Sequence, residues 1–120
     1  MELSLDQFID LLRRFEANPE TQEVRRTARI AIRRRVTIIT DPVDGTQTEM
    51  VLQDISRGGV SLTHHEGMPR DKRFVLILPT EGPRQEVPCI VRHCEMIKHH
   101  LFKIGAQFES PGETASKLAR

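Results

Sequence analysis

The chain has 120 residues and a formal net charge of +1, with 38% hydrophobic and 29% charged residues. This balance fits one domain with a modest core and a polar surface. The near-zero net charge argues against a general nucleic-acid binder, because such proteins usually have a basic domain. The sequence contains no apolar run long enough to span a membrane. Its first residues lack the basic and apolar regions of a signal peptide, so we expect a cytoplasmic protein.

An amphipathic helix is predicted over residues 3–17, within an N-terminal unit of residues 1–18. Ser4 and Gln7 match a capping box, and Asn18-Pro19 ends the helix because the residue before a proline avoids the helical region. Apolar residues recur at three- and four-residue spacing: Leu5, Phe8, Leu11, Leu12 and Phe15. This apolar face has two alternative uses. It packs on its own domain, which we favour, or it docks on a partner protein.

Residues 19–29 are polar and without clear periodicity, and we interpret them as a flexible segment that contains arginines. Arg25, Arg26 and Arg29 precede the first predicted strand. An arginine side chain presents a planar fork of donors that can bind phosphate or the O6 and N7 atoms of guanine. For the following run, Arg33–Arg35, we favour plain solvated charges, because strand parity points Arg33 and Arg35 away from the apolar face.

A barrel of six short antiparallel strands is predicted over residues 30–109, since alternating apolar segments are separated by regular turn signals. The turn signals include Asp41–Gly45 and Ser56–Gly59. The predicted strands are one that starts at Ile30, Thr46–Ile55, Val60–Thr63, one through Phe74 and Leu78, Val87–Met96 and Leu101–Phe108. Residues 110–120 are predicted as a short C-terminal helix or tail. The fold class is therefore mainly β.

The cysteines and histidines indicate neither a metal site nor catalysis. Cys89 and Cys94 are five residues apart, and this odd spacing places them on opposite faces of a regular strand. We therefore expect no disulfide between them. The neighbouring pairs His64-His65 and His99-His100, and His93, are interpreted as surface residues. No arrangement of residues suggests a nucleophile, a phosphate-binding Walker loop or paired catalytic carboxylates, so we do not expect an enzyme.

The stretch Asp54–Val60, with sequence DISRGGV, is a second candidate for ligand binding. The Asp54 carboxylate can accept hydrogen bonds from a guanine edge, and the Ser56 hydroxyl can bond a backbone group or a phosphate. Gly58 and Gly59 permit positive φ and close approach of the backbone to a ligand. Alone, the stretch is equally well explained as a serine–glycine turn between two strands.

Taken together, Arg25-x-x-x-Arg29 and Asp54-x-Ser56-x-x-Gly59 resemble the two-part signature of the PilZ domain family. The resemblance implies a six-stranded antiparallel barrel that binds the second messenger cyclic di-GMP. It further implies that Arg25 and Arg29, with Arg26 assisting, hold phosphates and guanine edges. Asp54 and Ser56 would contact a guanine and its surroundings, while Gly59, next to Gly58, would shape the turn. No cofactor and no metal are implied.

Three hypotheses follow from these patterns. The first is a cyclic di-GMP receptor without catalysis, in which the ligand orders residues 20–29 and changes how this segment or the helix meets a protein partner. The second is a PilZ-like adaptor that binds a protein partner without nucleotide. The third is nucleic-acid binding through Arg25–Arg35, which the absence of interleaved aromatic residues disfavours.

Overall fold

The computed structural model describes residues 3–15, 29–41, 43–78 and 85–109. The described residues form a helix and six strands: α1 (Leu5–Arg14), β1 (Arg29–Asp41), β2 (Thr46–Ser56), β3 (Gly59–His64), β4 (Arg73–Ile77), β5 (Glu86–Lys98) and β6 (Leu101–Phe108). Within these ranges, no helix is long and apolar enough to cross a membrane. The predicted flexible segment up to residue 28 and the predicted C-terminal helix or tail, 110–120, lie outside the described residues.

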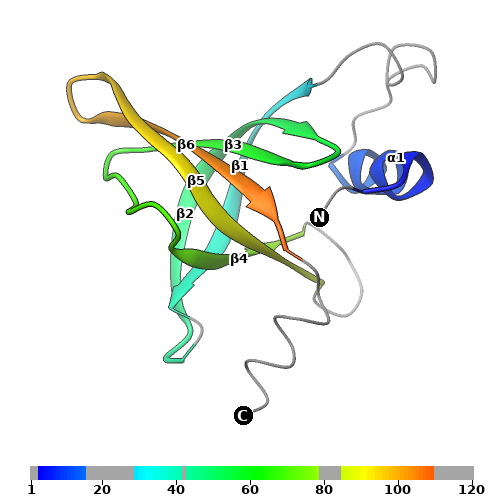
Figure 1. Cartoon of the computed structure of the whole chain (residues 1–120), viewed down its shortest axis with the longest axis horizontal. Helices are drawn as coiled ribbons and strands as arrows, with labels where there is room; N and C mark the ends of the chain where they lie inside the picture. Colours follow the sequence, from blue (N-terminus) through cyan, green and yellow to red (C-terminus); the bar gives the residue numbers. More distant parts are fainter. Residues whose placement is uncertain (1–2, 16–28, 42, 79–84, 110–120) are drawn as a thin grey trace.

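The strands form a closed antiparallel barrel in the order β1-β2-β3-β6-β5-β4, and β4 returns to pair with β1 (Figure 1). The closure places β3 beside β6, although these strands are far apart in the sequence. The predicted six-stranded barrel is confirmed. Its interior follows the period-two pattern of half-buried strands, as β6 illustrates with Ile104, Ala106 and Phe108 facing inward.

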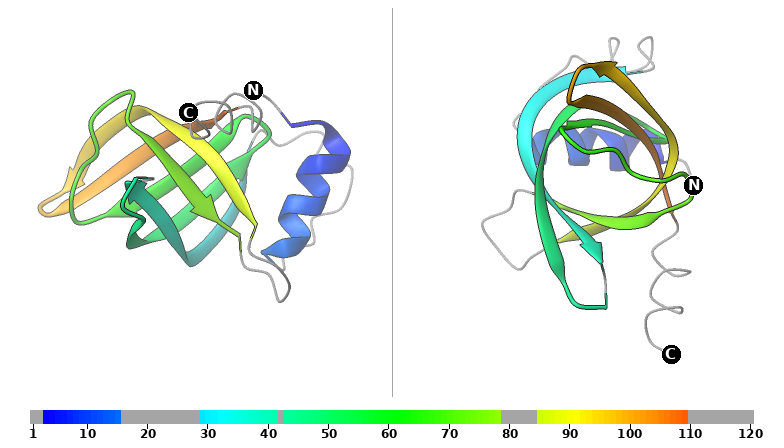
Figure 2. Two further views of the ribbon diagram at one scale, coloured as in Figure 1. Left: turned by 90° about the horizontal axis from the view of Figure 1, so that it is seen from below. Right: turned by 90° about the vertical axis from the view of Figure 1, so that its left-hand side faces the viewer.

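Helix α1 lies across one end of the barrel (Figure 2). Its apolar side chains belong to the same buried cluster as the barrel interior: Phe8, Leu11, Leu12 and Phe15. The apolar face therefore packs on the chain's own barrel, the alternative that the sequence analysis favours. The expected capping box is present, because Gln7 N donates to Ser4 Oγ and Ser4 N donates to Gln7 Oε1. The helix ends at Arg14, and residues 16–18 of the predicted unit lie outside the described part of the chain.

The start of the helix is also bonded to the turn between β2 and β3. Leu3 N donates to Arg57 O at 2.7 Å, and Arg57 Nε donates to Leu3 O at 2.8 Å. These two bonds join backbone groups before the first helical turn to a residue inside the stretch DISRGG. The candidate ligand-binding turn and α1 are therefore in direct contact.

Several register shifts interrupt the strand parity that the sequence predicts, and those in β5 and in the first half of β1 bear on predictions made above. In β5 the register shifts between Val91 and His93, so that Arg92 is an extra residue opposite β6. As a result Cys94 pairs with the inward-facing Ile104 and packs against the core to which Cys89 also belongs. The prediction that the two cysteines face opposite sides is wrong, because period-two parity does not continue through a bulge. Neither cysteine forms a disulfide.

The second bulge lies in β1, where the register shifts between Ala31 and Arg34. Arg33 has a φ of 56°, in the left-handed region that non-glycine residues seldom occupy. The bulge interrupts the alternation that continues from Ile30, and all three residues of Arg33–Arg35 are exposed. Their exposure agrees with the solvated charges that we expected.

Candidate functional site

The turn between β2 and β3 is organised by the hydroxyl group of Ser56. Its Oγ accepts hydrogen bonds from Gly58 N at 3.3 Å and from Gly59 N at 3.1 Å. Serine side chains commonly stabilise tight turns in this way, because the hydroxyl replaces a backbone acceptor. Ser56 thus shapes the turn from inside, and it also lines the open groove beside it.

The two glycines of this turn have different structural roles from those expected. Within the described residues, Gly45 is the one glycine with a positive φ. Gly58 and Gly59 therefore do not adopt left-handed backbone. A Cβ atom at Gly59 would lie 1.9 Å from the carbonyl oxygen of Ala106 on β6, whereas one at Gly58 would meet nothing within 4 Å. Gly59 is therefore required for close packing of β3 on β6. Of the two expected reasons for these glycines, positive φ is wrong, and close approach of the backbone to a ligand stays a prediction.

Arg29 and Asp54 bring the two sequence motifs together. Arg29 is the first residue of β1 and lies opposite Ser56 of β2 in the strand register. Its Nη1 atom is 2.7 Å from Asp54 Oδ1. The arginine side chain is 57% exposed and the aspartate side chain 21%. Exposed ion pairs are worth only about 0–1 kcal/mol, so Arg29 can turn from Asp54 to an incoming anion at small cost.

An open groove of about 630 Å³ extends from this ion pair across the outer wall of the barrel. Its first side contains four residues from the predicted site: Arg29, Ser56, Gly58 and Gly59. Asp54 is adjacent to this side through its bond to Arg29. Arg25 and Arg26, the remaining predicted site residues, lie outside the described residues. The structure thus gathers every described member of the predicted site at one place.

The other side of the groove was not predicted from the sequence. It is formed by outward-facing and small residues of β3, β5 and β6: Ser61, Arg92, His93, Lys103, Gly105, Ala106 and Gln107. These residues come together because β6 pairs with both β3 and β5. The pairing of β5 with β6 is that of a local hairpin, whereas no local pattern in the sequence reveals the pairing of β6 with β3. The parity of β6, which places Lys103, Gly105 and Gln107 on the outer face, was the only available signal.

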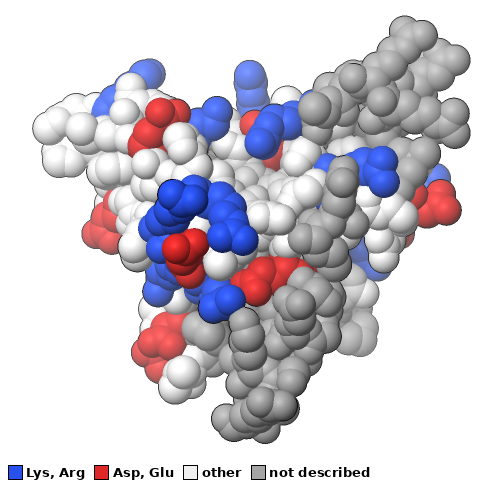
Figure 3. Space-filling view, viewed as in Figure 1, with Lys and Arg blue, Asp and Glu red and all other residues white. Residues whose placement is uncertain are grey.

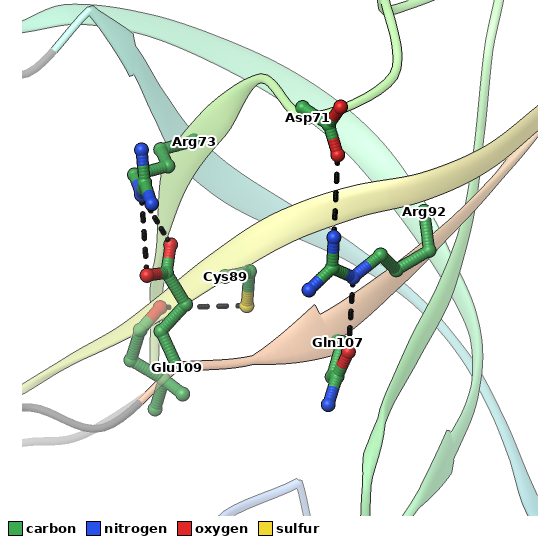
Figure 4. Close-up of polar contacts among 7 residues, drawn as sticks. Asp71, Arg73, Cys89, Arg92, Gln107 and Glu109 are labelled. Atoms are coloured by element: carbon green, nitrogen blue, oxygen red, sulfur yellow. Dashed lines mark hydrogen bonds and ion pairs between the residues drawn. The ribbon is translucent and has the colours of Figure 1, made fainter. Parts of the chain in front are cut away.

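Arg92 is held in a fixed position on this second side. Its Nε donates to Gln107 Oε1 at 3.0 Å, and its Nη1 lies 3.2 Å from Asp71 Oδ1 (Figure 4). Asp71 comes from the loop before β4, so three segments of the chain determine where the guanidinium group lies. The adjacent His93 has its Nε2 atom 3.5 Å from Glu95 Oε1.

The buried carboxylate and thiol near this wall are structural in character. Arg73 Nε donates to both carboxylate oxygens of Glu109, at 2.9 and 3.2 Å (Figure 4). Burial, and then the charge of Glu109, raise the pKa of the Cys89 thiol well above its ordinary value. Cys89 is therefore protonated at neutral pH, which makes it a poor nucleophile.

The histidine pairs lie away from the groove. The rings of His64 and His65 are 4.2 Å apart, and those of His99 and His100 are 3.9 Å apart. Within the described ranges, no three His, Cys, Asp or Glu side chains are grouped so that they could hold a metal ion. His64, His65, His99 and His100 do not line the groove, whereas His93 does. The interpretation of His93 as an ordinary surface residue therefore missed its position beside the site.

Charge is mixed on the face of the molecule that Figure 3 shows. Figure 3 shows basic side chains grouped around an acidic one on this face, with further acidic residues nearby. Such a pattern agrees with the net charge of +1. It differs from the continuous basic face that is typical of proteins that bind long nucleic acids. The cations of the groove are local and suit a compact anion better than a polymer.

Comparison with known proteins identifies the family. The family model described as PilZ domain matches residues 23–120. Among solved structures, the K. pneumonia protein MrkH in complex with c-di-GMP is similar, with a TM-score of 0.54, 19% identity and coverage of 74% of this chain and 46% of that one. The Bacillus subtilis inhibitor of motility, MotI/DgrA, has a TM-score of 0.51, 17% identity and coverage of 74% and 45%.

At these identities the structural neighbours establish the fold alone, and this chain spans less than half the length of either. Comparison with curated proteins found no match. The family model, by contrast, covers most of the chain, including both sequence motifs and all six strands. On this evidence the chain belongs to the PilZ domain family.

Proposed function

We propose that this chain is a receptor domain for cyclic di-GMP. The observation that most directly supports the proposal is the position of Arg29, 2.7 Å from Asp54 and opposite Ser56. The two halves of the family signature are 25 residues apart in the sequence, measured from Arg29 to Asp54, and meet at one edge of an open groove. A structural neighbour, MrkH, was solved in complex with the same ligand.

The chemistry of this edge fits a guanine dinucleotide. The Asp54 carboxylate accepts hydrogen bonds, and the N1–H and N2–H groups of guanine form a matching pair of donors. The Arg29 guanidinium can bind a phosphate oxygen or the O6 and N7 atoms of guanine. In the free protein the Arg29 guanidinium and the Asp54 carboxylate bond each other. A bound ligand would offer a guanine edge to Asp54 and a phosphate to Arg29 in exchange.

Arg25 and Arg26 complete the proposed cationic side. Their distance from Arg29 along the chain is short enough for all three guanidinium groups to approach one ligand that carries two phosphates. We propose that Arg25 and Arg29 hold phosphates and guanine edges, and that Arg26 assists. Ordering of the segment before β1 would then accompany binding.

The bonds between Arg57 and Leu3 support coupling of ligand binding to protein interaction. Arg57 lies between Ser56 and Gly58, two residues that line the groove. Its backbone and side chain both bond Leu3, immediately before α1. A ligand that moves the turn would therefore alter the contacts that hold the start of α1. We propose that the signal reaches a partner protein through α1 or the segment that follows it.

Isothermal titration calorimetry with cyclic di-GMP tests the proposal, with GMP as the ligand control. We expect saturable binding of cyclic di-GMP and weak or no binding of GMP. The variant Arg29→Ala should weaken binding about tenfold or more, because a charge-assisted hydrogen bond is worth about 1.5–3 kcal/mol. Arg35→Ala, an exposed arginine of the same strand that does not line the groove, is the matched control.

The two remaining hypotheses, an adaptor without nucleotide and a nucleic-acid binder, predict different results in titrations. A PilZ-like adaptor without nucleotide would give no heat with cyclic di-GMP at any concentration. Its proposed contact surface, the apolar face of α1, is buried against the barrel in this structure. A nucleic-acid binder would instead bind DNA or RNA with a steep dependence on salt concentration.

A further inference from the structure

We infer that Ser61 and Arg92 form a second binding element of the groove, which receives a phosphate oxygen of the ligand. This inference rests on the proposed function and extends it from the motif residues to the opposite side of the groove. Neither residue belongs to the RxxxR or DxSxxG motif. Their roles follow from a hydroxyl group that lacks a partner and from an arginine that a bulge places at the groove.

Ser61 lies on the floor of the groove with an unsatisfied hydroxyl group. Ser61 is 2% exposed. Among the described residues, its Oγ is the one buried side-chain oxygen or nitrogen that has no hydrogen-bond partner. Its register partners are Gly105 on β6, which has no side chain, and Asp54 on β2, whose carboxylate bonds Arg29. Ser61 nevertheless lines the groove, although its Oγ atom is covered in the free protein, so a ligand can bond it only after a small rearrangement of the groove wall.

A buried hydroxyl without a partner is unfavourable for the folded protein. The group loses its hydrogen bonds to water on folding and gains none in exchange. Replacing such a serine by alanine is nearly neutral or stabilising, since the methyl group needs no partner. A serine kept at this position is best explained by a hydrogen bond that forms only when a ligand occupies the groove.

Arg92 is placed at the groove by the bulge in β5. Val91 and His93 pair with consecutive β6 residues, Ala106 and Gly105, so Arg92 has no register partner of its own and both Arg92 and His93 are exposed. Bulges commonly re-aim a side chain next to a functional site. The bonds to Gln107 and Asp71 use the Nε and Nη1 atoms of Arg92. Because a guanidinium group has five N–H donors, donors remain for an anion.

The two sides of the groove are therefore cationic, with a strip of small residues between them. Arg29 lies on one side, and Arg92 and Lys103 lie on the other, next to the His93 ring. Between them the groove is lined by small residues, among them Gly59 and Gly105. The acidic neighbours of the second side, Asp71 and Glu95, are paired with Arg92 and His93 and orient these side chains.

Cations on two sides of one groove suit a ring that has two phosphates on opposite sides. A ligand with a single phosphate would use one cationic side and leave the other unpaired. Arg92 is pre-positioned by two neighbours, so little side-chain entropy is lost when it binds an anion. We assign the phosphate nearer to β5 and β6 to Arg92, with the Ser61 hydroxyl donating to an oxygen of the same phosphate.

The variant Ser61→Ala gives the more discriminating test. We measure the affinity for cyclic di-GMP by calorimetry and the melting temperature without ligand. The expected result is an affinity about tenfold lower, together with a melting temperature equal to or above that of the wild type. A lower melting temperature with unchanged affinity would show that the Ser61 hydroxyl stabilises the fold and does not bind the ligand, and would overturn the inference.

The variant Arg92→Gln is compared with Arg35→Gln, which removes the same charge from an exposed position outside the groove. We expect Arg92→Gln to lower the affinity about tenfold or more, and Arg35→Gln to change it less than twofold. Arg92→Lys, which keeps the charge but not the fork of donors, should lie between the wild type and Arg92→Gln.

The outcomes separate this inference from the proposed function. If the wild type binds cyclic di-GMP and both Ser61→Ala and Arg92→Gln bind it equally well, the second binding element does not exist while the receptor function stands. If the wild type itself does not bind, both proposals are wrong. Loss of affinity in both variants, with melting temperatures maintained, supports the inference.

Discussion

The end of the barrel that α1 covers and the groove on the outer wall differ in how their residues are used. At the covered end, Phe8, Leu12 and Phe15 are at most 2% exposed and belong to the common core. In the groove, Arg29 and Arg92 have side chains that are 57% and 49% exposed and form surface ion pairs. The first region provides stability, whereas the second provides polar groups that a ligand can recruit at small cost. A substitution should therefore affect either folding or binding, according to the region in which it lies.

The largest effect is expected for Phe8→Ala at the covered end. Truncation of a fully buried phenylalanine leaves a cavity and typically lowers the free energy of unfolding by about 3–5 kcal/mol. Urea unfolding measures the change, with Arg13→Ala on the exposed side of the same helix as the control. A change below about 1 kcal/mol in Phe8→Ala would show that α1 does not pack on the barrel in solution.

Gly59→Ala tests the boundary between the two regions. The new Cβ atom would lie 1.9 Å from Ala106 O, so β3 and β6 must separate, and we expect a loss of about 1–3 kcal/mol in the free energy of unfolding. Gly58→Ala is the matched control, because its Cβ atom meets nothing within 4 Å. Both variants are measured by thermal and urea unfolding. Equal stability of the two variants would contradict the packing role assigned to Gly59.

Arg57→Ala should have a smaller effect, which is concentrated at α1. The substitution removes the bond from Arg57 Nε to Leu3 O but leaves the backbone bond from Leu3 N. A single hydrogen bond contributes about 0.5–1.5 kcal/mol to stability. Amide hydrogen exchange is expected to become faster in α1 and to stay unchanged in β5 and β6. Uniformly faster exchange would indicate a general loss of stability and not a local contact with the helix.

The smallest effect concerns Cys89 and depends on pH. Its thiol has a raised pKa in the folded protein, so the unfolded chain loses this proton first as the pH rises. The stability contribution of the protonated thiol is complete below the ordinary pKa of about 9.0 and decreases as the pH rises above it. We expect Cys89→Ala to reduce the decrease in melting temperature between pH 8 and pH 10. An identical pH profile in wild type and variant would show that Cys89 is not shielded from solvent.

Most of the barrel could be predicted from the sequence because its strands follow local alternation. Leu101–Phe108 is predicted with the bounds that β6 has, and β2 continues only to Ser56, one residue past the prediction. β1 likewise begins at Arg29, one residue before the predicted start. These strands are amphipathic, and period two is a local property. The turn at Ser56 is also local, since a serine and two glycines between strands indicate it.

The bulges and the second side of the groove could not be predicted in this way. A bulge is defined by the register of two paired strands, and the sequence around Arg92 does not specify that register. The error for Cys94 and the omission of Arg92 have this one cause. Ser61 was missed for a related reason. Its burial and its lack of a partner depend on Gly105, 44 positions away in the chain.

The most direct test of the central claim is chemical-shift mapping by NMR of the ¹⁵N-labelled chain during titration with cyclic di-GMP. The account predicts the largest amide shifts at the groove, namely at Gly58, Gly59, Ser61, Gly105 and Gln107, and small shifts at the turn of Val43–Gly45. Saturating ligand without any shifts, or shifts confined to residues outside the groove, would contradict the claim that cyclic di-GMP binds between Arg29 and Arg92.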